Sequence, residues 1–170
     1  MSLVVEDGSG LSTAEAFASV AEADAYWTLR GVPSAWSSST TAQKEEALRL
    51  AAAFLETEGH ARWKGTRYSA AQRLAWPRDG VYVDRQCLDR AVVPRALKEA
   101  NIEAALRSRT ATAGLVPDET EVGIASESVT VGPITESKSY RGEKSAATRY
   151  EYVDRLLAPL LRTRGQMDRA

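Results

Sequence analysis

The stretch that decides the fold is Gln72-Arg73-Leu74-Ala75-Trp76-Pro77-Arg78, followed after a short crossing by Val93-Pro94-Arg95-Ala96-Leu97-Lys98-Glu99-Ala100. Pro77 biases Trp76 away from helical geometry, so a brief helical turn at 69–74 ends there. Pro94 suits a helix start, because its fixed φ and missing N–H cost nothing at that position. The pattern predicts a rigid elbow that orients a helix running to about Arg109. The elbow motif consists of Gln72, Leu74, Trp76, Pro77, Arg78 and Pro94.

Apolar spacing predicts three further helices. Ser19-Val20-Ala21-Glu22 forms a capping box that starts a helix at 20–30, which Gly31 ends. A helix at 41–57 carries apolar residues at i, i+3, i+4 and i+7, and a last helix at 150–161 is rich in Leu. Pro159 is expected to bend this last helix late. Trp36 falls in a Ser-rich loop between the first two helices.

The pattern changes to strand-like alternation beyond Gly114. Residues 122–130 alternate with β-branched side chains, Gly132-Pro133 forms a turn, and 134–140 returns as a second strand. The predicted fold is therefore mainly α, a small helical bundle of about four helices with a β-hairpin near the C-terminal third and extended terminal arms. We expect an extended N-terminal arm at 1–18, a helical bundle core at 19–114, the β-hairpin and linker at 115–148, and a C-terminal helix and tail at 149–170.

Composition limits the protein class. At 170 residues the chain suits one domain. No run of about 18 apolar residues exists, which excludes a membrane span. The N-terminus does not have the pattern of a signal peptide. Cys87 is alone, so no internal disulfide is expected and a reducing compartment is indicated.

Charge is unevenly distributed along the chain. The net charge is −1, but residues 1–59 carry three basic and nine acidic side chains, whereas residues 60–109 carry eleven basic and five acidic. Such complementary sections can pack against each other within or between subunits, or the basic section can face nucleic acid. Arg outnumbers Lys 17 to 5, which suits bidentate interfaces but equally follows from a GC-rich genome.

The residues of catalytic and metal sites are missing from the sequence. His60 is the single histidine, and no nucleophile elbow, phosphate-binding loop or EF-hand spacing accompanies it. We therefore predict that the protein is not an enzyme and has no metal and no cofactor.

Aromatic and basic residues alternate between residues 62 and 85, and two interpretations stay open. Stacking aromatics with backbone-tracking cations are what a single-strand DNA binder needs. Alternatively, Trp63 and Trp76 anchor the elbow against the helices, which is preferred because this loop has few aliphatic residues to hold it. The candidate DNA-facing residues are Arg62, Lys64, Arg67, Arg73 and Arg78.

The order of the features resembles a family of tailed-bacteriophage proteins named DnaT-like single-strand DNA-binding proteins, which are similar to head–tail connector (adaptor, neck) proteins. The matching pieces are Val4-Val5-Glu6-Asp7-Gly8, Ser19 to Tyr26, Trp36, Arg62-Trp63-Lys64-Gly65, Gln72 to Arg78, Val93 to Ala100, Val131-Gly132-Pro133-Ile134 and Val153 to Leu161. They cover nearly the whole chain.

The connector resemblance implies a ring, usually of twelve copies, that docks on the portal protein at the virion neck. Such a ring extends the channel for double-stranded DNA and provides the attachment surface for a neck or tail-completion protein. The implied partners are thus further copies of the chain, the portal, the neck or tail protein and the DNA, with no membrane. The expected location is the virion neck, after synthesis in the host cytoplasm. The candidate subunit or portal interface is Val131, Gly132, Pro133, Ile134, Leu160, Leu161, Arg162 and Arg164.

The family name implies the alternative, a single-strand DNA-binding protein acting in replication or recombination. Affinity for phosphates requires a basic excess, and the chain as a whole has none. On this argument the connector is the preferred interpretation of the sequence.

Overall fold

A computed structural model describes residues 2–59, 62–111, 115, 126–131, 134–139 and 150–162, with the backbone alone for 126–131 and 134–139. In this part of the chain five α-helices accompany three pairs of short antiparallel strands, so a mainly α fold with some β is confirmed. The chain divides into two compact units. Unit 1 is residues 1–115 with 150–170, and unit 2 is residues 116–149.

The first helix of unit 1 begins at a side-chain cap, and the second begins after Pro33 without a side-chain cap hydrogen bond. Ser19 and Glu22 form the predicted capping box at the start of α1 (Val20–Thr28), and Gly31 follows with φ +83°. The loop expected around Trp36 instead contains a short helix, α2 (Ser34–Ser37). Trp36 is buried there and its Nε1–H donates to Asp24 Oδ1 at 2.7 Å, so one aromatic anchor gives this segment its structure.

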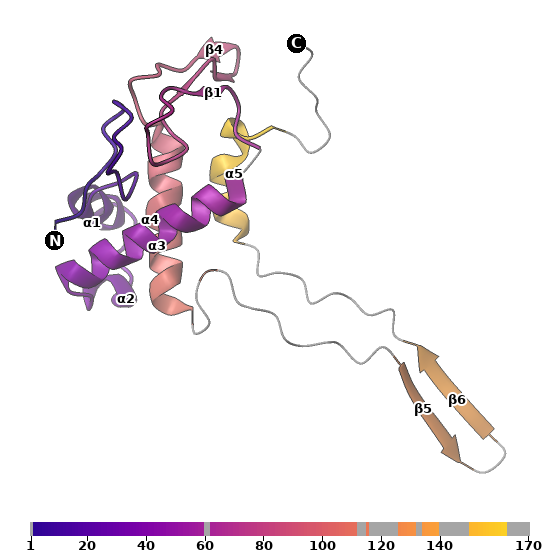
Figure 1. Cartoon of the computed structure of the whole chain (residues 1–170). Helices are drawn as coiled ribbons and strands as arrows, with labels where there is room; N and C mark the ends of the chain where they lie inside the picture. The colour runs from indigo at the N-terminus through magenta and orange to yellow at the C-terminus, as the bar shows by residue number, and fades with distance from the viewer. Residues whose placement is uncertain are drawn as a thin grey trace. The chain divides into compact units, whose positions relative to one another are not determined.

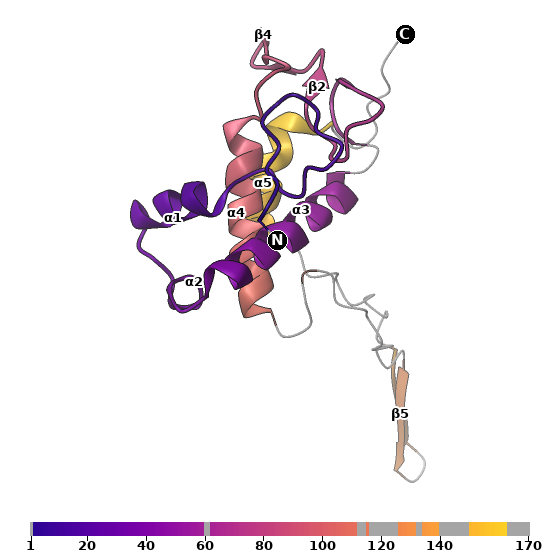
Figure 2. The same ribbon diagram turned by 60° about the vertical axis from the view of Figure 1, so that its left-hand side comes forward.

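Three helices form the centre of unit 1. α3 (Thr41–Gly59) packs against α4 (Arg95–Thr110), and α4 packs against α5 (Glu151–Leu157). The two views in Figures 1 and 2 both show α3 crossing α4. Buried alanines such as Ala51 and Ala100 allow this close approach. The predicted last helix divides into α5 and a 3₁₀ turn, η1 (Ala158–Leu160), because Pro159 lacks the N–H that an α-helix would use.

Residues 2–18, the predicted N-terminal arm, contain no helix and lie against the core of unit 1. Asn101 on α4 is fully buried, and its Oδ1 accepts the N–H groups of Phe17 and Ala18 at 3.1 and 3.2 Å. Its Nδ2 donates to Leu48 O on α3 at 3.1 Å. One side chain therefore ties the N-terminal segment to two helices.

Unit 2 contains the predicted hairpin. β5 (Ser126–Val131) pairs antiparallel with β6 (Ile134–Ser139), and the register places Val131 opposite Ile134 and Ser126 opposite Ser139. The turn residues Gly132 and Pro133 lie outside the described residues. Within the part of the chain that the structure describes, no helix is long and apolar enough to cross a membrane.

Candidate nucleic-acid interface

The elbow lies on a core of two tryptophans. Trp63 and Trp76 are 5% and 0% exposed and meet edge to face, with ring centroids 6.3 Å apart. The Trp76–Pro77 peptide bond is cis. Gln72 is also buried, and its Nε2 donates to the carbonyls of Leu74 and Pro77 at 2.8 and 3.0 Å. The structure thus places both tryptophans inside unit 1, where a DNA base cannot stack on them.

Two predicted DNA-facing arginines bind the backbone of the elbow. A terminal nitrogen of Arg67 donates to the carbonyls of residues 72, 73 and 74 at 2.6, 3.2 and 3.1 Å. Arg78 donates to Lys64 O and Gly65 O, both at 2.7 Å. Burial, followed by the charges of Arg162 and Arg67, lowers the pKa of Arg78 from its ordinary value. Both side chains therefore shape the elbow, and neither forms an ion pair with a described carboxylate, although their charges act on Glu56 and lower its pKa against the effect of burial.

The exposed aromatics of this segment are tyrosines. Tyr68 is 45% exposed and Tyr82 59%. The guanidinium carbon of Arg90 lies 5.1 Å from the ring centroid of Tyr68, and Arg90 also approaches Asp79 at 3.6 Å. Tyr68 follows β1 (Thr66–Arg67), which pairs with β2 (Arg78–Asp79), and Tyr82 begins β3 (Tyr82–Val83), which pairs with β4 (Gln86–Cys87). These short strand pairs, which the sequence did not indicate, present both rings to solvent.

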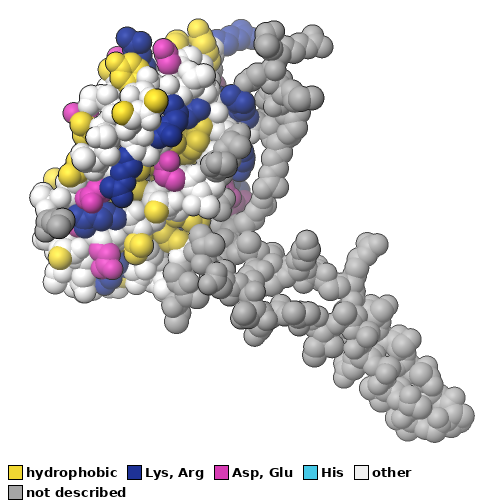
Figure 3. Space-filling model, in the orientation of Figure 1, with side chains coloured by type: hydrophobic (Ala, Val, Ile, Leu, Met, Phe, Trp, Pro, Cys, Tyr) yellow, Lys and Arg dark blue, Asp and Glu magenta, His cyan; other side chains and the backbone are white. Residues whose placement is uncertain are grey.

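Positive charge gathers on the same segment. Residues 62–90 contain seven Lys and Arg against three Asp. Arg73 and Arg85 are exposed, and neither side chain has a hydrogen bond or ion pair among the described residues. Figure 3 shows Lys and Arg side chains on the face of unit 1 that carries this segment, with Asp and Glu side chains among them. We call residues 62–90 the elbow surface.

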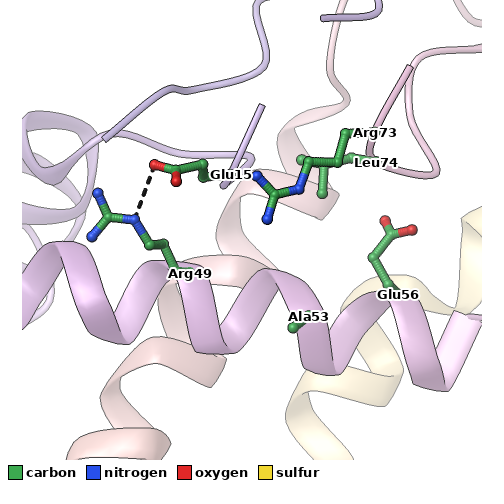
Figure 4. Close-up of a pocket in the computed structure, with 6 residues that line it drawn as sticks. All are labelled: Glu15, Arg49, Ala53, Glu56, Arg73 and Leu74. Carbon is green, nitrogen blue, oxygen red and sulfur yellow. Dashed lines mark hydrogen bonds and ion pairs between the residues drawn. The ribbon is translucent and has the colours of Figure 1, made fainter. Parts of the chain in front are cut away.

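An open pocket of about 360 Å³ borders this surface (Figure 4). Arg49 pairs with Glu15 at 3.0 Å, and that hydrogen bond lowers the pKa of Glu15. Arg73 extends above α3 between Glu15 and Glu56. Burial raises the pKa of Glu56, although its carboxylate accepts the N–H of Ala75 at 2.7 Å. The lining comes from segments distant in sequence, which is why no local motif predicted it. The complete lining is Glu15, Arg49, Ala53, Glu56, Arg73 and Leu74.

The other predicted site residues do not form one surface, because some are buried in unit 1, some lie in unit 2 and some lie outside the described residues. Lys64 Nζ donates to Pro159 O at 2.8 Å, and Arg62 is half-buried. Pro94 precedes the first residue of α4. Of the predicted interface, Leu160 and Leu161 are buried within unit 1 and Arg162 is half-buried. Val131 and Ile134 lie in the paired strands of unit 2, whereas Gly132, Pro133 and Arg164 lie outside the described residues.

The described residues contain no group of three or more His, Cys, Asp or Glu side chains that could hold a metal ion. His60 lies outside them. That the protein is not an enzyme stays a prediction.

A comparison with known protein families finds one family model that matches the whole chain. A family model described as "Putative DnaT-like ssDNA binding protein" matches residues 1–170. The chain belongs to this DnaT-like family. No curated protein and no solved structure matches it.

Membership in the DnaT-like family corrects the preferred functional interpretation. The head–tail connector was wrong, and with it the portal, the twelve-copy ring, the neck or tail-completion protein and the channel for double-stranded DNA as partners. The single-strand DNA binder was disfavoured because the chain as a whole has no basic excess, but the elbow surface has a local one. The virion neck as a location depended on the connector and stays a prediction without support from the family.

Proposed function

We propose that this DnaT-like protein binds single-stranded DNA through its elbow surface. The observation that carries the proposal is the half-exposed ring of Tyr68, with the Arg90 guanidinium 5.1 Å from its centroid, on a segment of net positive charge. A solvent-exposed aromatic ring beside cations is the arrangement that binds single strands with little sequence preference. The description of the family supports the same ligand.

Stacking on the two tyrosines would discriminate single strands from duplexes. Base stacking on an aromatic side chain contributes about 1–3 kcal/mol per base, and the base must expose its face to do so. A duplex keeps these faces inside its own stack. Tyr68 and Tyr82 therefore favour a strand whose bases can turn outward.

The cations would follow the phosphate backbone. Arg73 and Arg85 are exposed and form no hydrogen bond or ion pair among the described residues, although the charge of Arg73 acts on Glu15, so binding a phosphate breaks no existing ion pair. A surface with a few such contacts gives modest affinity that falls as salt rises, with a slope of about 0.7 per phosphate on a single strand. The local excess on the elbow surface is enough for this mode, although the whole chain is nearly neutral.

Fluorescence anisotropy with a labelled oligo(dT) of about 15 nucleotides tests the proposal, since a domain of this kind covers about 4–16 nucleotides. Tyr68→Ala and Tyr82→Ala are each expected to weaken binding by about 5- to 150-fold, the equivalent of one lost stacking contact. Tyr152→Ala is the matched control, because Tyr152 on α5 is also 45% exposed but lies away from the elbow surface in sequence. The proposal fails if oligo(dT) does not bind, or if all three variants bind like the wild type. It also fails if a duplex of the same length binds more tightly than the single strand.

A further inference from the structure

The pocket in Figure 4 lies between α3 and the elbow surface. Arg49, Ala53 and Glu56 line it from α3, where their spacing of four and three residues places them on one face of the helix. Arg73 and Leu74 line it from the elbow surface. Its volume of about 360 Å³ is near the lower end of the range for ligand pockets, about 300–1,000 Å³. A pocket of this size suits one small ring system, next to the surface proposed for the strand.

The charges that line the pocket balance. The lining contains two arginines and two glutamates, and Arg49 pairs with Glu15 at 3.0 Å. Arg49 also approaches Glu45 at 3.6 Å, and the charge of Arg73 acts on Glu15. A lining without net charge gives a phosphate little attraction. It suits instead a neutral group that both donates and accepts hydrogen bonds.

Glu56 offers the pocket an acceptor. Its Oε1 accepts the N–H of Ala75 at 2.7 Å, whereas its Oε2 has no hydrogen bond among the described residues. The side chain is half-buried, and Figure 4 shows its carboxylate pointing away from α3. Burial raises the pKa of this carboxyl, and the hydrogen bond from Ala75 and the charges of Arg67 and Arg78 oppose the rise. Oε2 is therefore an acceptor that a ligand in the pocket can use without displacing Ala75.

Arg73 offers the pocket donors. Its side chain is exposed and forms no hydrogen bond or ion pair among the described residues. Figure 4 shows its guanidinium above α3, between Glu15 and Glu56. A guanidinium carries five N–H donors and no acceptor. Ala53 and Leu74 add apolar surface to the same lining. The pocket thus combines a carboxylate oxygen, free N–H donors and an apolar side, which match the edge and the face of a nucleobase.

We propose that this pocket holds one unpaired base of the strand and prefers a base with an exocyclic amine, such as cytosine, over thymine. The amine would donate to Glu56 Oε2, and an acceptor on the same base would bind Arg73. In protein–DNA complexes Glu accepts from the N4 amine of cytosine, and Arg donates to base carbonyl and ring-nitrogen acceptors. Thymine has no exocyclic amine, and its one ring N–H lies between two oxygens that a carboxylate repels.

The two parts of this proposal have different supports. That the base belongs to a DNA strand rests on the proposed function. The preference for an amine rests on the free Oε2 of Glu56 beside the donors of Arg73. The tyrosines of the elbow surface would bind any base by stacking, so the pocket would add a sequence preference at one position of the strand.

The first experiment compares oligo(dT) of about 15 nucleotides with the same strand carrying one central deoxycytidine, by fluorescence anisotropy. The cytosine is expected to tighten wild-type binding by about fivefold or more, the lower end of the discrimination that one side-chain pair provides. Glu56→Gln keeps an acceptor for Ala75 but can present an amide N–H in place of Oε2, so it should remove the preference for cytosine. Glu46→Gln is the control, because Glu46 is an exposed carboxylate on α3 outside the lining.

The ratio of the two affinities decides the outcome, because the loss of one negative charge changes both affinities alike. Equal binding of the two strands by the wild type overturns the base pocket and leaves the proposed function standing. A cytosine preference that survives in Glu56→Gln, or that disappears equally in Glu46→Gln, also overturns the pocket. Failure of both strands to bind refutes the proposed function.

The second experiment needs neither a variant nor a strand. Deoxycytidine and thymidine are neutral nucleosides, so they test the pocket without a phosphate. Each is titrated into isotope-labelled wild-type protein, and NMR follows the backbone amide of Ala75, which donates to Glu56. Deoxycytidine should shift this resonance in a saturable way, and thymidine should shift it much less. Equal responses, or no response to millimolar deoxycytidine, overturn the pocket. A response to deoxycytidine in a protein that binds neither strand keeps the base pocket and refutes the proposed function.

Discussion

The burial of Trp76 separates the folding role of the elbow from its binding role, and the Trp76→Ala substitution tests this separation. Trp76 is 0% exposed and packs edge to face on Trp63. Truncating a buried Trp to Ala costs about 3–5 kcal/mol, from lost burial plus the cavity left behind. Since domains of this size have about 5–15 kcal/mol of total stability, the variant should lose a large fraction of it.

The matched substitution is Tyr68→Ala on the same segment. Tyr68 is half-exposed, and its described ring contact is the Arg90 guanidinium, a contact that contributes about 0.5–1 kcal/mol at exposed sites. Its removal should therefore lower the free energy of unfolding by about 1 kcal/mol or less. Binding of oligo(dT), in contrast, should fall by the stacking energy of one base, about 1–3 kcal/mol.

Urea unfolding followed by circular dichroism measures both stabilities, and anisotropy on the folded fraction measures binding. We expect the two variants to show opposite defects. Trp76→Ala should be unstable, but its folded fraction should still bind DNA. Tyr68→Ala should be nearly as stable as the wild type but should bind DNA weakly. A Trp76→Ala protein of wild-type stability that no longer binds oligo(dT) would refute the reasoning, because Trp76 would then face the strand.

Two further predictions concern groups inside unit 1. Asn101→Ala should lower the free energy of unfolding by about 2 kcal/mol or more, because it leaves the buried N–H groups of Phe17 and Ala18 unsatisfied at about 1–3 kcal/mol each, and urea unfolding checks it. Burial raises the pKa of Glu56, so folding favours its protonated form, and stability should fall as pH rises from the ordinary carboxyl pKa through the raised value. Glu56→Gln should remove this fall while keeping an acceptor for Ala75, so the difference in unfolding free energy between the two proteins should change over that pH range. The lowered pKa values of Glu15 and Asp24 have the opposite effect on the pH dependence of stability, but this effect is common to the wild type and Glu56→Gln. A difference in unfolding free energy that stays constant with pH would contradict the raised pKa of Glu56.

Local signals in the sequence predicted the helices well. The Ser19–Glu22 capping box and Pro94 identified the starts of α1 and α4, because a cap acts within one turn of the chain. Asn101 gave no such signal, since its partners Phe17 and Leu48 are more than fifty residues away and become neighbours only after α3 and α4 pack. The pocket depends on long-range pairing in the same way, because its lining comes from residues 15, 49–56 and 73–74.

The aromatic and basic alternation between residues 62 and 85 shows why residue type alone could not assign the binding surface. Both interpretations depended on whether the tryptophans contact DNA or pack in the core. The sequence does not show which aromatic rings are buried in the folded protein. In the structure Trp63 and Trp76 are buried, whereas Tyr68 and Tyr82 are exposed. The aromatics divide, therefore, into anchors and candidate stacking rings.

The cations of the elbow divide differently, because a folding role does not remove their charge. Arg67 and Arg78 bind backbone carbonyls and form no ion pair with a described carboxylate, so they stabilise the elbow while their positive charge is offset only by the charge of Glu56. Had the same turn been held by ion pairs, its net potential would have been near zero. The elbow surface thus gains an attraction for phosphate from the interactions that fix its shape. A single-strand binder of nearly neutral total charge is physically reasonable on this basis, since the potential that a strand meets depends on the charges around it and not on the sum over the chain.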